Sequence, residues 1–285
     1  MRQFRFGECN PRNVSRFDVR RQPKQGPPQH DPRMIVGHMR KLRAARDVAV
    51  RGQLAYVADG PHGLRVFDLT DPRSPLEIGF RDTGDARRVR LRGGFAVVAD
   101  GEHGLKVVDV SRPTEPVRVA SLDTLPALDV ALHGDLAVVA AGPKGLRIVD
   151  LSDPRSPVEL GTCATRDARG VAVQGALAFV ADGERGLAVV DIAEPAHPIQ
   201  VAGYSTPEAL DVAVSGRFAY LADGRAGLIV LDVSDPRRPA QFAELSLEGI
   251  AGLAVQSSHV YAATAFGLQA IHVVDEGTSF AVASC

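Results

Sequence analysis

Short apolar runs separated by turn residues recur along most of the chain. In residues 45–85 the runs DVAV, LAYVADG, GLRVFDL and PLEIGF are rich in Val, Ile, Leu, Phe and Tyr. Gly, Pro, Asp and Ser lie between them, which is typical of strands joined by tight turns. No unit contains a long segment with the 3.6-residue period of a helix. We therefore predict four short strands in this unit.

The units repeat at a nearly constant interval. A Gly-Leu pair recurs every 41 residues and, in the last unit, after 40, at Gly63-Leu64, Gly104-Leu105, Gly145-Leu146, Gly186-Leu187, Gly227-Leu228 and Gly267-Leu268. Four strands in about 41 residues is the size of one β-propeller blade. The predicted units, in one structural domain, are 45–85, 86–126, 127–167, 168–208, 209–249 and 250–285.

Two of the repeats carry a family signature. LRIVDLSDP (146–154) and LIVLDVSDP (228–236), each preceded by YVADG or a variant, resemble the LVIVD-repeat family of β-propellers. The resemblance covers residues 45 to about 274 and implies an all-β propeller of four-stranded blades. That family is described mostly as surface or secreted bacterial and archaeal propellers without an agreed activity. The resemblance therefore implies a fold rather than a function.

The N-terminal residues 1–44 hold a partial copy of the repeat. FRFGECNPRNVSRFDV (4–19) aligns with LAYVADGPHGLRVFDL (54–69), and MIVGH (34–38) aligns with LEIGF (76–80). We expect strands two to four of a blade there, without a first strand. Because a closed ring has no exposed sheet edges, we also expect residues 1–44 to take part in ring closure.

The number of blades depends on both chain ends. The C-terminal SFAVASC resembles a first and a fourth strand about equally, and its spacing from His272 favours a fourth strand. Seven blades are our first prediction, and six blades with an N-terminal extension are the alternative.

Charge is unevenly distributed along a chain whose net charge is −1. Residues 1–46 hold twelve of the 33 Lys and Arg residues and three of the 34 Asp and Glu residues, so they carry +9 and the remainder carries −10. A basic arm is typical of nucleic-acid binding. However, no aromatic-rich RNA platform or nucleic-acid motif is present. We favour the interpretation that the basic segment neutralises an acidic ring within one molecule.

Composition also bears on compartment and metal binding. No run of 18 apolar residues predicts a transmembrane helix, and MRQFRFGECN lacks the apolar region of a signal peptide, which predicts a cytoplasmic protein. The family resemblance implies the cell surface or secretion, and a missing leader would reconcile the two. Cys9, Cys163 and Cys285 have no CxxC spacing, so we predict neither a disulfide framework nor a zinc site. We predict no cofactor.

Catalytic motifs are largely missing. GTSFAVAS (277–284) resembles the segment around the nucleophilic serine of subtilisin-like proteases, which would make Ser279 the nucleophile, and DTG (82–84) mimics their aspartate motif. A serine nucleophile needs a histidine base, and no matching histidine segment exists. We interpret GTS (277–279) as a chance match and predict no catalytic residue.

Repeated polar residues at the hairpin corners are candidate ligands. His62 and His103 occupy the same corner of consecutive units and could approach a shared metal, but Lys144 and Arg185 continue that series. We favour surface turn residues and predict no metal site. We also predict that the repeated aspartates cap their own turns rather than forming a ligand ring; they are Asp59, Asp100, Asp182 and Asp223.

A rigid ring presents its variable residues on loops. In propellers the loops joining strands two to three and strand four to the next blade lie on one face, which normally binds the partner. The residues just before each inner strand also vary between units. The predicted partner-binding residues are Arg46, Asp47, His62, Arg87, Arg88, His103, Asp129, Lys144, Arg169, Arg185, Asp211 and Arg225.

These features predict a non-catalytic propeller scaffold that binds another protein through its loop face. An arginine-rich face suits a polar, salt-sensitive interface with an acidic patch on the partner. The first alternative is a small-ligand-binding or enzymatic propeller with its site in the central channel, formed by Arg87, Arg88 and the carboxylates of Asp47, Asp129 and Asp211. The second alternative is a subunit of a nucleic-acid-associated assembly, docked by residues 1–46.

Overall fold

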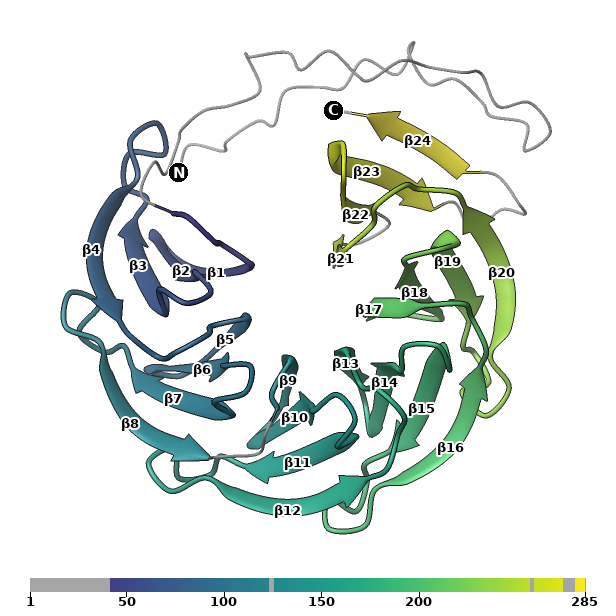
Figure 1. The fold of residues 1–285 in the computed structure, drawn as a ribbon, viewed down its shortest axis with the longest axis horizontal. Helices are drawn as coiled ribbons and strands as arrows, with labels where there is room; N and C mark the ends of the chain where they lie inside the picture. Colours follow the sequence, from purple (N-terminus) through teal and green to yellow (C-terminus); the bar gives the residue numbers. More distant parts are fainter. Residues whose placement is uncertain (1–41, 123–125, 257–258, 274–279, 285) are drawn as a thin grey trace.

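The computed structural model describes residues 42–122, 126–256 and 259–273 and the backbone of 280–284. These residues form 24 strands in six four-stranded sheets (Figure 1). Each sheet is an antiparallel meander of consecutive strands and makes one propeller blade. The prediction of an all-β propeller with four-stranded blades is confirmed. Within the described ranges no helix has the length and hydropathy needed to cross a membrane.

Each blade takes four successive strands, numbered from the centre of the propeller outward. Blades 1 and 2 comprise β1 (Asp47–Arg51), β2 (Leu54–Ala58), β3 (Leu64–Asp68), β4 (Leu76–Arg81), β5 (Arg88–Arg92), β6 (Phe95–Ala99), β7 (Leu105–Asp109) and β8 (Val117–Leu122). Blades 3 and 4 comprise β9 (Asp129–His133), β10 (Leu136–Ala140), β11 (Leu146–Asp150), β12 (Val158–Cys163), β13 (Gly170–Gln174), β14 (Leu177–Ala181), β15 (Leu187–Asp191) and β16 (Ile199–Tyr204). Blades 5 and 6 comprise β17 (Ala209–Ser215), β18 (Phe218–Asp223), β19 (Gly227–Asp232), β20 (Ala240–Leu245), β21 (Gly252–Gln256), β22 (His259–Thr264), β23 (Gly267–Val273) and β24 (Phe280–Ser284).

The described residues form six blades, so the first prediction of seven is wrong for this part of the chain. Each of the six repeats supplies one complete sheet, and β24 pairs with β23 as the fourth strand of blade 6. The C-terminal stretch therefore completes its own blade, as its spacing favoured. The expected N-terminal partial blade falls on residues 1–44, of which 1–41 lie outside the described residues.

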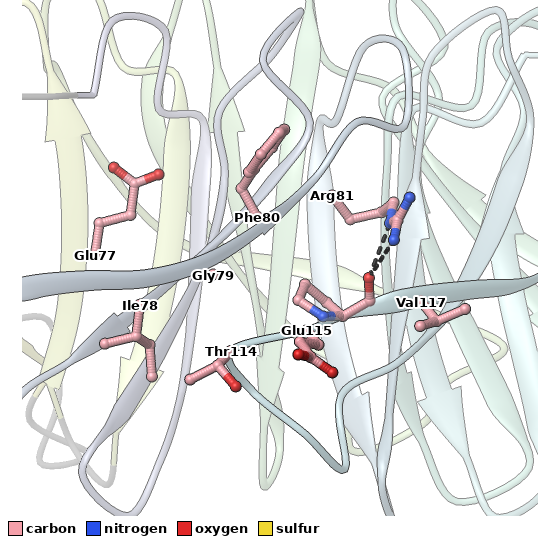
Figure 2. Close-up of a pocket in the computed structure, with 9 residues that line it drawn as sticks. Glu77, Ile78, Gly79, Phe80, Arg81, Thr114, Glu115 and Val117 are labelled. Atoms are coloured by element: carbon pink, nitrogen blue, oxygen red, sulfur yellow. Dashed lines mark hydrogen bonds between the residues drawn. The ribbon is translucent and has the colours of Figure 1, made fainter.

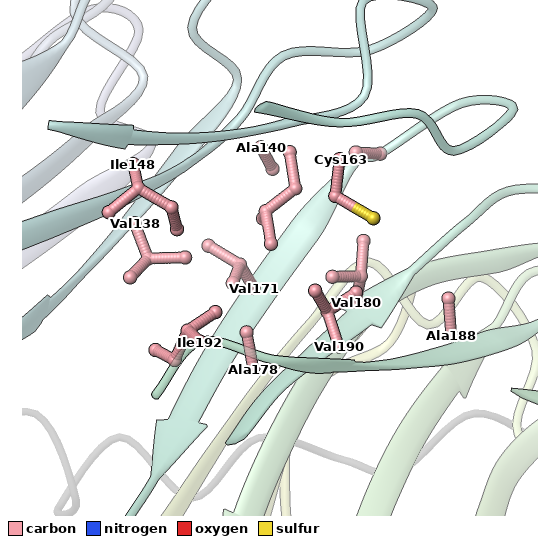
Figure 3. Packing of buried hydrophobic residues seen from close by; sticks show 12 residues of the cluster. Val138, Ala140, Ile148, Cys163, Val171, Ala178, Val180, Ala188, Val190 and Ile192 are labelled. Atoms are coloured by element: carbon pink, nitrogen blue, oxygen red, sulfur yellow. The ribbon is translucent and has the colours of Figure 1, made fainter. Parts of the chain in front are cut away.

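The hydrophobic core lies between neighbouring blades. Figure 3 shows Val138 and Ile148 of blade 3 facing Val171 and Val190 of blade 4, and all four side chains are buried. Equivalent clusters join the other neighbouring blades. A strand packed on both faces must be apolar on both faces, which explains why the repeats lack clean polar alternation.

The outermost strands are held by the loop of the following blade. Arg81 donates from Nε and Nη2 to the carbonyl oxygen of Pro116, at 2.9 and 2.7 Å (Figure 2). A Cβ on Gly79 would lie 2.2 Å from the carbonyl oxygen of Pro113. Glycine at position 79 therefore allows this loop to approach the backbone of β4. A shallow hollow of about 520 Å³ remains beside the contact.

The arc of blades leaves two blade faces uncovered by any other described blade. Val48 on β1 is 53% exposed, whereas its equivalent Val89 on β5 is fully buried. Leu268 on β23 is 62% exposed, whereas its equivalent Leu228 on β19 is fully buried. Figure 1 shows these two blades at opposite ends of the arc. The difference in burial follows from position in the arc, because the residue types match.

Candidate functional site

The hairpin corners and the connections between blades meet on one end of the propeller, which we call the upper face. It comprises the corners 59–63, 100–104, 141–145, 182–186 and 223–227 and the described parts of the connections 82–87, 123–128, 164–169 and 205–210. Gly60 and Ala86 exchange two backbone hydrogen bonds, at 3.0 and 2.8 Å, and so tie a corner to a connection. The same bridge recurs at Gly101–Ala127, Gly142–Ala168 and Gly183–Ala209.

The repeated corner aspartates fix these connections. The carboxylate of Asp100 accepts a hydrogen bond from the backbone N–H of Asp85 at 2.9 Å, and that of Asp182 accepts one from Asp167 at 2.6 Å. Asp59 and Asp223 accept equivalent bonds from Ala44 and Glu208. The prediction that these residues cap their own turns is therefore wrong for the described bonds of Asp59, Asp100 and Asp182. Asp223 also caps its turn, since it accepts from the backbone of Arg225 and Ala226.

Blade 3 lacks this carboxylate and also lacks its donor. Ala141 stands where the other corners have aspartate, and Pro126 stands where the connection would supply the N–H. Proline has no backbone N–H, so no acceptor is required at position 141. Nε of Arg147 is buried and has no hydrogen-bond partner among the described residues, whereas its equivalent in Arg65 donates to Asp59 at 2.8 Å. Pro126 removes the backbone donor and Ala141, 15 residues later, removes its acceptor, so neither substitution leaves a backbone N–H without its partner.

Carboxylates balance several of the predicted arginines. Asp85 lies 3.0 Å from both Arg46 and Arg87. Glu208 lies 3.5 Å from both Arg169 and Arg225. Arg169 also pairs with the carboxylate two residues before it, that of Asp167, at 2.7 Å. The sequence-based list of site residues missed Asp85, Asp167 and Glu208. A carboxylate two residues before Arg87 and Arg169 was the available signal.

On the upper face of blades 3 and 4, three basic side chains have no carboxylate of the described residues beside them. Within the described residues, the side chains of Lys144, Arg166 and Arg185 form no ion pair, and all three residues are exposed. His62 is half-buried and His103 is exposed at the corresponding corners of blades 1 and 2. The structure describes no group of three or more His, Cys, Asp or Glu side chains placed to hold a metal ion.

The central channel holds a second cluster of charges. One repeat position at the mouth of each inner strand reads alternately acidic and non-acidic, in the order Asp47, Arg88, Asp129, Gly170, Asp211 and Gly252. Each of the three aspartates accepts a backbone N–H of the next inner strand at 2.9 Å, from Val89, Val171 and Leu253 respectively. These carboxylates therefore link neighbouring blades at the centre.

Arg88 neutralises two of the channel carboxylates. Its guanidinium lies 3.4 Å from Asp129 and 3.1 Å from Asp211, whose side chains are 2% and 7% exposed. Arg90 pairs with Asp47 at 2.7 Å. Arg88 was predicted on the loop face beside Arg87, with the central channel as the alternative, and the structure places its guanidinium among the channel carboxylates. Arg90 was missed because the sequence comparison considered only the residues just before each inner strand, whereas Arg90 is the third residue of β5.

Burial and charge set the pKa values in this cluster. Burial raises the pKa of Asp211 to about 6; Arg88 opposes the rise and Asp129 adds to it. Burial alone would lower the pKa of Arg88, but Asp129, Asp211 and Asp47 raise it overall. A Cβ on Gly170 would lie 2.9 Å from Oδ1 of Asp211, so glycine there leaves room for this carboxylate. Every described charge in the channel has an opposite charge beside it.

The raised pKa of Asp211 predicts a pH-dependent stability. The folded protein binds a proton at Asp211 with a pKa of about 6, against 3.8 for an unperturbed aspartate. This contribution to the free energy of unfolding is complete below pH 3.8 and is lost as the pH rises through 6, by about 3 kcal/mol. Urea unfolding of the wild type and Asp211→Asn between about pH 4 and pH 8 measures it. A difference between the two proteins that did not change with pH would contradict the assignment.

A second hollow lies on the upper and outer side of blade 4. Its volume is about 590 Å³, and Asp182, Ala188, Gln200 and Tyr204 contribute to its lining. Ser279 and the rest of the GTS segment lie outside the described residues.

Sequence comparison identifies the repeats. The LVIVD repeat profile matches residues 42–83, 83–124, 126–165, 166–206 and 208–243. With the six described blades, these matches define a repeat-built β-propeller. The chain belongs to the LVIVD-repeat family, as the resemblance of its repeats predicted. A search of curated proteins finds no match.

Solved structures share the architecture at very low sequence identity. A protein of Bacteroides fragilis, provisionally assigned as a 6-phosphogluconolactonase, aligns with a TM-score of 0.69 and 10% identity over 83% of this chain and 82% of its own. The computationally designed Ika8 protein aligns with a TM-score of 0.62 and 9% identity over 81% of this chain and 71% of its own. At such identities the similarity establishes the fold alone.

Proposed function

We propose that this propeller is a non-catalytic scaffold that binds another protein through the upper face of blades 3 and 4. The observation that carries the proposal is the exposed set of Lys144, Arg166 and Arg185, which form no ion pair within the described residues. On the neighbouring blades, the upper-face arginines Arg87 and Arg225 are paired with carboxylates of the chain itself. A partner with an acidic patch supplies the charges that these three cations lack.

The scaffold suits this role because it holds the cations in fixed positions. Lys144 and Arg185 lie at equivalent corners of adjacent blades, and each corner is tied to a connection by backbone hydrogen bonds. A rigid surface loses little conformational entropy on binding. Charged groups at the rim of such an interface chiefly set the association rate and its salt dependence.

The test is a charge reversal on each end of the propeller. We expect an affinity pull-down from host lysate to capture a protein with the wild type and lose it with Lys144→Glu/Arg185→Glu. The matched control, Arg73→Glu/Arg237→Glu, makes the same charge change in the exposed turns between the third and fourth strands, on the opposite end. Equal capture by both variants would rule out the upper face. Capture of nothing by the wild type would count against a protein scaffold.

A ligand site in the central channel is the second candidate, and the raised pKa of Asp211 favours it. Arg88 already occupies the space between Asp129 and Asp211, so a ligand would have to displace an ion pair. Docking of nucleic acid by residues 1–46 stays a prediction, because 1–41 lie outside the described residues. Salt-sensitive binding of RNA or DNA that is lost on deletion of 1–46 would support it.

A further inference from the structure

One position of the repeat carries a long basic side chain in the first three blades. It is the second residue of the third strand, occupied by Arg65, Lys106 and Arg147. Arg65 shows its role most fully. Its Nε donates to the corner carboxylate of Asp59 at 2.8 Å, and its Nη1 donates to Glu77 on the outer strand at 2.7 Å. The chain thus builds its own guanidinium site between the corner and the outer strand.

Blade 4 keeps one half of this arrangement and has lost the other. The basic residue is replaced by Ala188, and the outer glutamate is replaced by Gln200, while the corner carboxylate remains as Asp182. Figure 3 shows Ala188 at the edge of the core between blades 3 and 4. Blade 5 makes a different replacement, because the buried side chain of Ile229 fills the position. Only a methyl group occupies it in blade 4.

The space left by this replacement is the hollow of about 590 Å³. Asp182 contributes to its lining and is 4% exposed, whereas Asp59, Asp100 and Asp223 are completely buried. Oγ1 of Thr165, another residue of the lining, is buried without a hydrogen-bond partner in the described part of the chain. The hollow therefore offers a carboxylate and a spare hydroxyl where the equivalent place in blade 1 is filled.

We propose that this hollow binds the guanidinium of an arginine side chain from a protein partner. Arg65 is the template. In the same orientation an incoming guanidinium donates to the carboxylate of Asp182 and to the side-chain oxygen of Gln200. Its aliphatic stem packs against Ala188 and Tyr204. The protein origin of the arginine rests on the proposed function, whereas the preference for a guanidinium rests on the hollow alone.

The surroundings specify the residues beside this arginine. Arg166 and Arg185 also contribute to the lining, and they repel an isolated cation. Acidic residues on either side of the arginine would pair with them and remove the repulsion. The preferred ligand is therefore an arginine flanked by aspartate or glutamate. Such a segment fits the acidic patch expected of a partner on this face.

Short peptides test the site without any partner. We expect acetyl-Glu-Arg-Glu-amide to bind, with chemical-shift changes at the amides of Ala188 and Gln200. Acetyl-Gln-Arg-Gln-amide should bind more weakly. A peptide with citrulline in place of arginine keeps the shape and loses the charge, and it should bind about tenfold to 100-fold more weakly than the arginine peptide. Equal binding of the citrulline and arginine peptides, or no binding of the acidic arginine peptide, would overturn the proposal.

Substitutions that fill the hollow test the same site from the side of the protein. Ala188→Arg/Gln200→Glu installs the residue types of blade 1, and we expect it to abolish peptide binding and raise the thermal stability. Ala188→Met blocks the same space without a charge and should also abolish binding. Peptide binding retained by both folded variants would place the site elsewhere. Peptide binding without capture of any protein partner would keep the arginine site and contradict the scaffold. Partner capture without peptide binding would support the scaffold and contradict the arginine site.

Discussion

Arg88→Met is expected to lower the free energy of unfolding by about 3–5 kcal/mol at pH 8. The substitution keeps an unbranched stem but removes the guanidinium between the two carboxylates, so that Asp211 loses its paired cation and Asp129 keeps only Arg90, at 3.7 Å. Because Arg88 lowers the pKa of Asp211, its removal raises that pKa further above 6. The loss should therefore be smaller at pH 5, where Asp211 is protonated in both proteins.

The neighbouring arginine is the control for this experiment. Arg87 also pairs with a carboxylate, but its side chain is 37% exposed and that of its partner Asp85 is 24% exposed. Exposed pairs contribute little, so Arg87→Met should cost less than about 1 kcal/mol. The chain has no tryptophan, so urea unfolding followed by circular dichroism is the appropriate measurement. Equal losses in the two variants would show that the channel pairs do not hold the ring.

The second large effect is expected for Gly186→Ala, which should lower the free energy of unfolding by about 3–5 kcal/mol. Gly186 has a φ of +79°, which costs an alanine about 1–2 kcal/mol. A Cβ there would also lie 2.2 Å from the carbonyl oxygen of Tyr204 and 2.4 Å from the backbone nitrogen of Thr206. Both contacts are with backbone atoms of the connection, which cannot move without breaking the links between blades 4 and 5.

A second glycine separates backbone strain from this contact. Gly175 has a φ of +59°, and a Cβ there would meet no atom of the described residues within 4 Å. Gly175→Ala should therefore lose only the strain, about 1–2 kcal/mol. Urea unfolding of both variants gives the comparison. Similar losses at the two positions would mean that the connection yields to the added methyl group.

The blades could be predicted because their signals are local. Apolar runs, turn residues and a constant spacing occur within each repeat, and a strand meander needs no long-range information. The assignment of glycine to tight turns accounts for the positive φ of Gly186 but not for the close contact beside it. The approach of the Tyr204 carbonyl oxygen joins parts of the chain 18 residues apart and has no separate signature. The number of blades was harder, because the N-terminal alignment rested on a few matching residues.

The sequence indicated where several charged residues of the candidate site lie, but it did not indicate which of them form ion pairs. The sequence placed Arg46 and Arg87 on one face, but their shared partner Asp85 depends on how two blades meet. Arg88 follows Arg87 directly, yet successive residues at the start of a strand point in opposite directions. One side chain reaches the upper face and the other reaches the channel. The alternation of Asp47, Asp129 and Asp211 with non-acidic residues was the signal for the channel.

The pairing of Pro126 with Ala141 limits how this protein can be recombined. In blades 1, 2, 4 and 5 an aspartate accepts the N–H of a residue 15 positions earlier, so a transferable module must contain both positions. A boundary placed between the connection and the inner strand separates them. Such an exchange would leave an aspartate opposite Pro126, or Ala141 opposite a backbone donor. Blade shuffling within this chain should therefore cut upstream of each connection, so that donor and acceptor are inherited together.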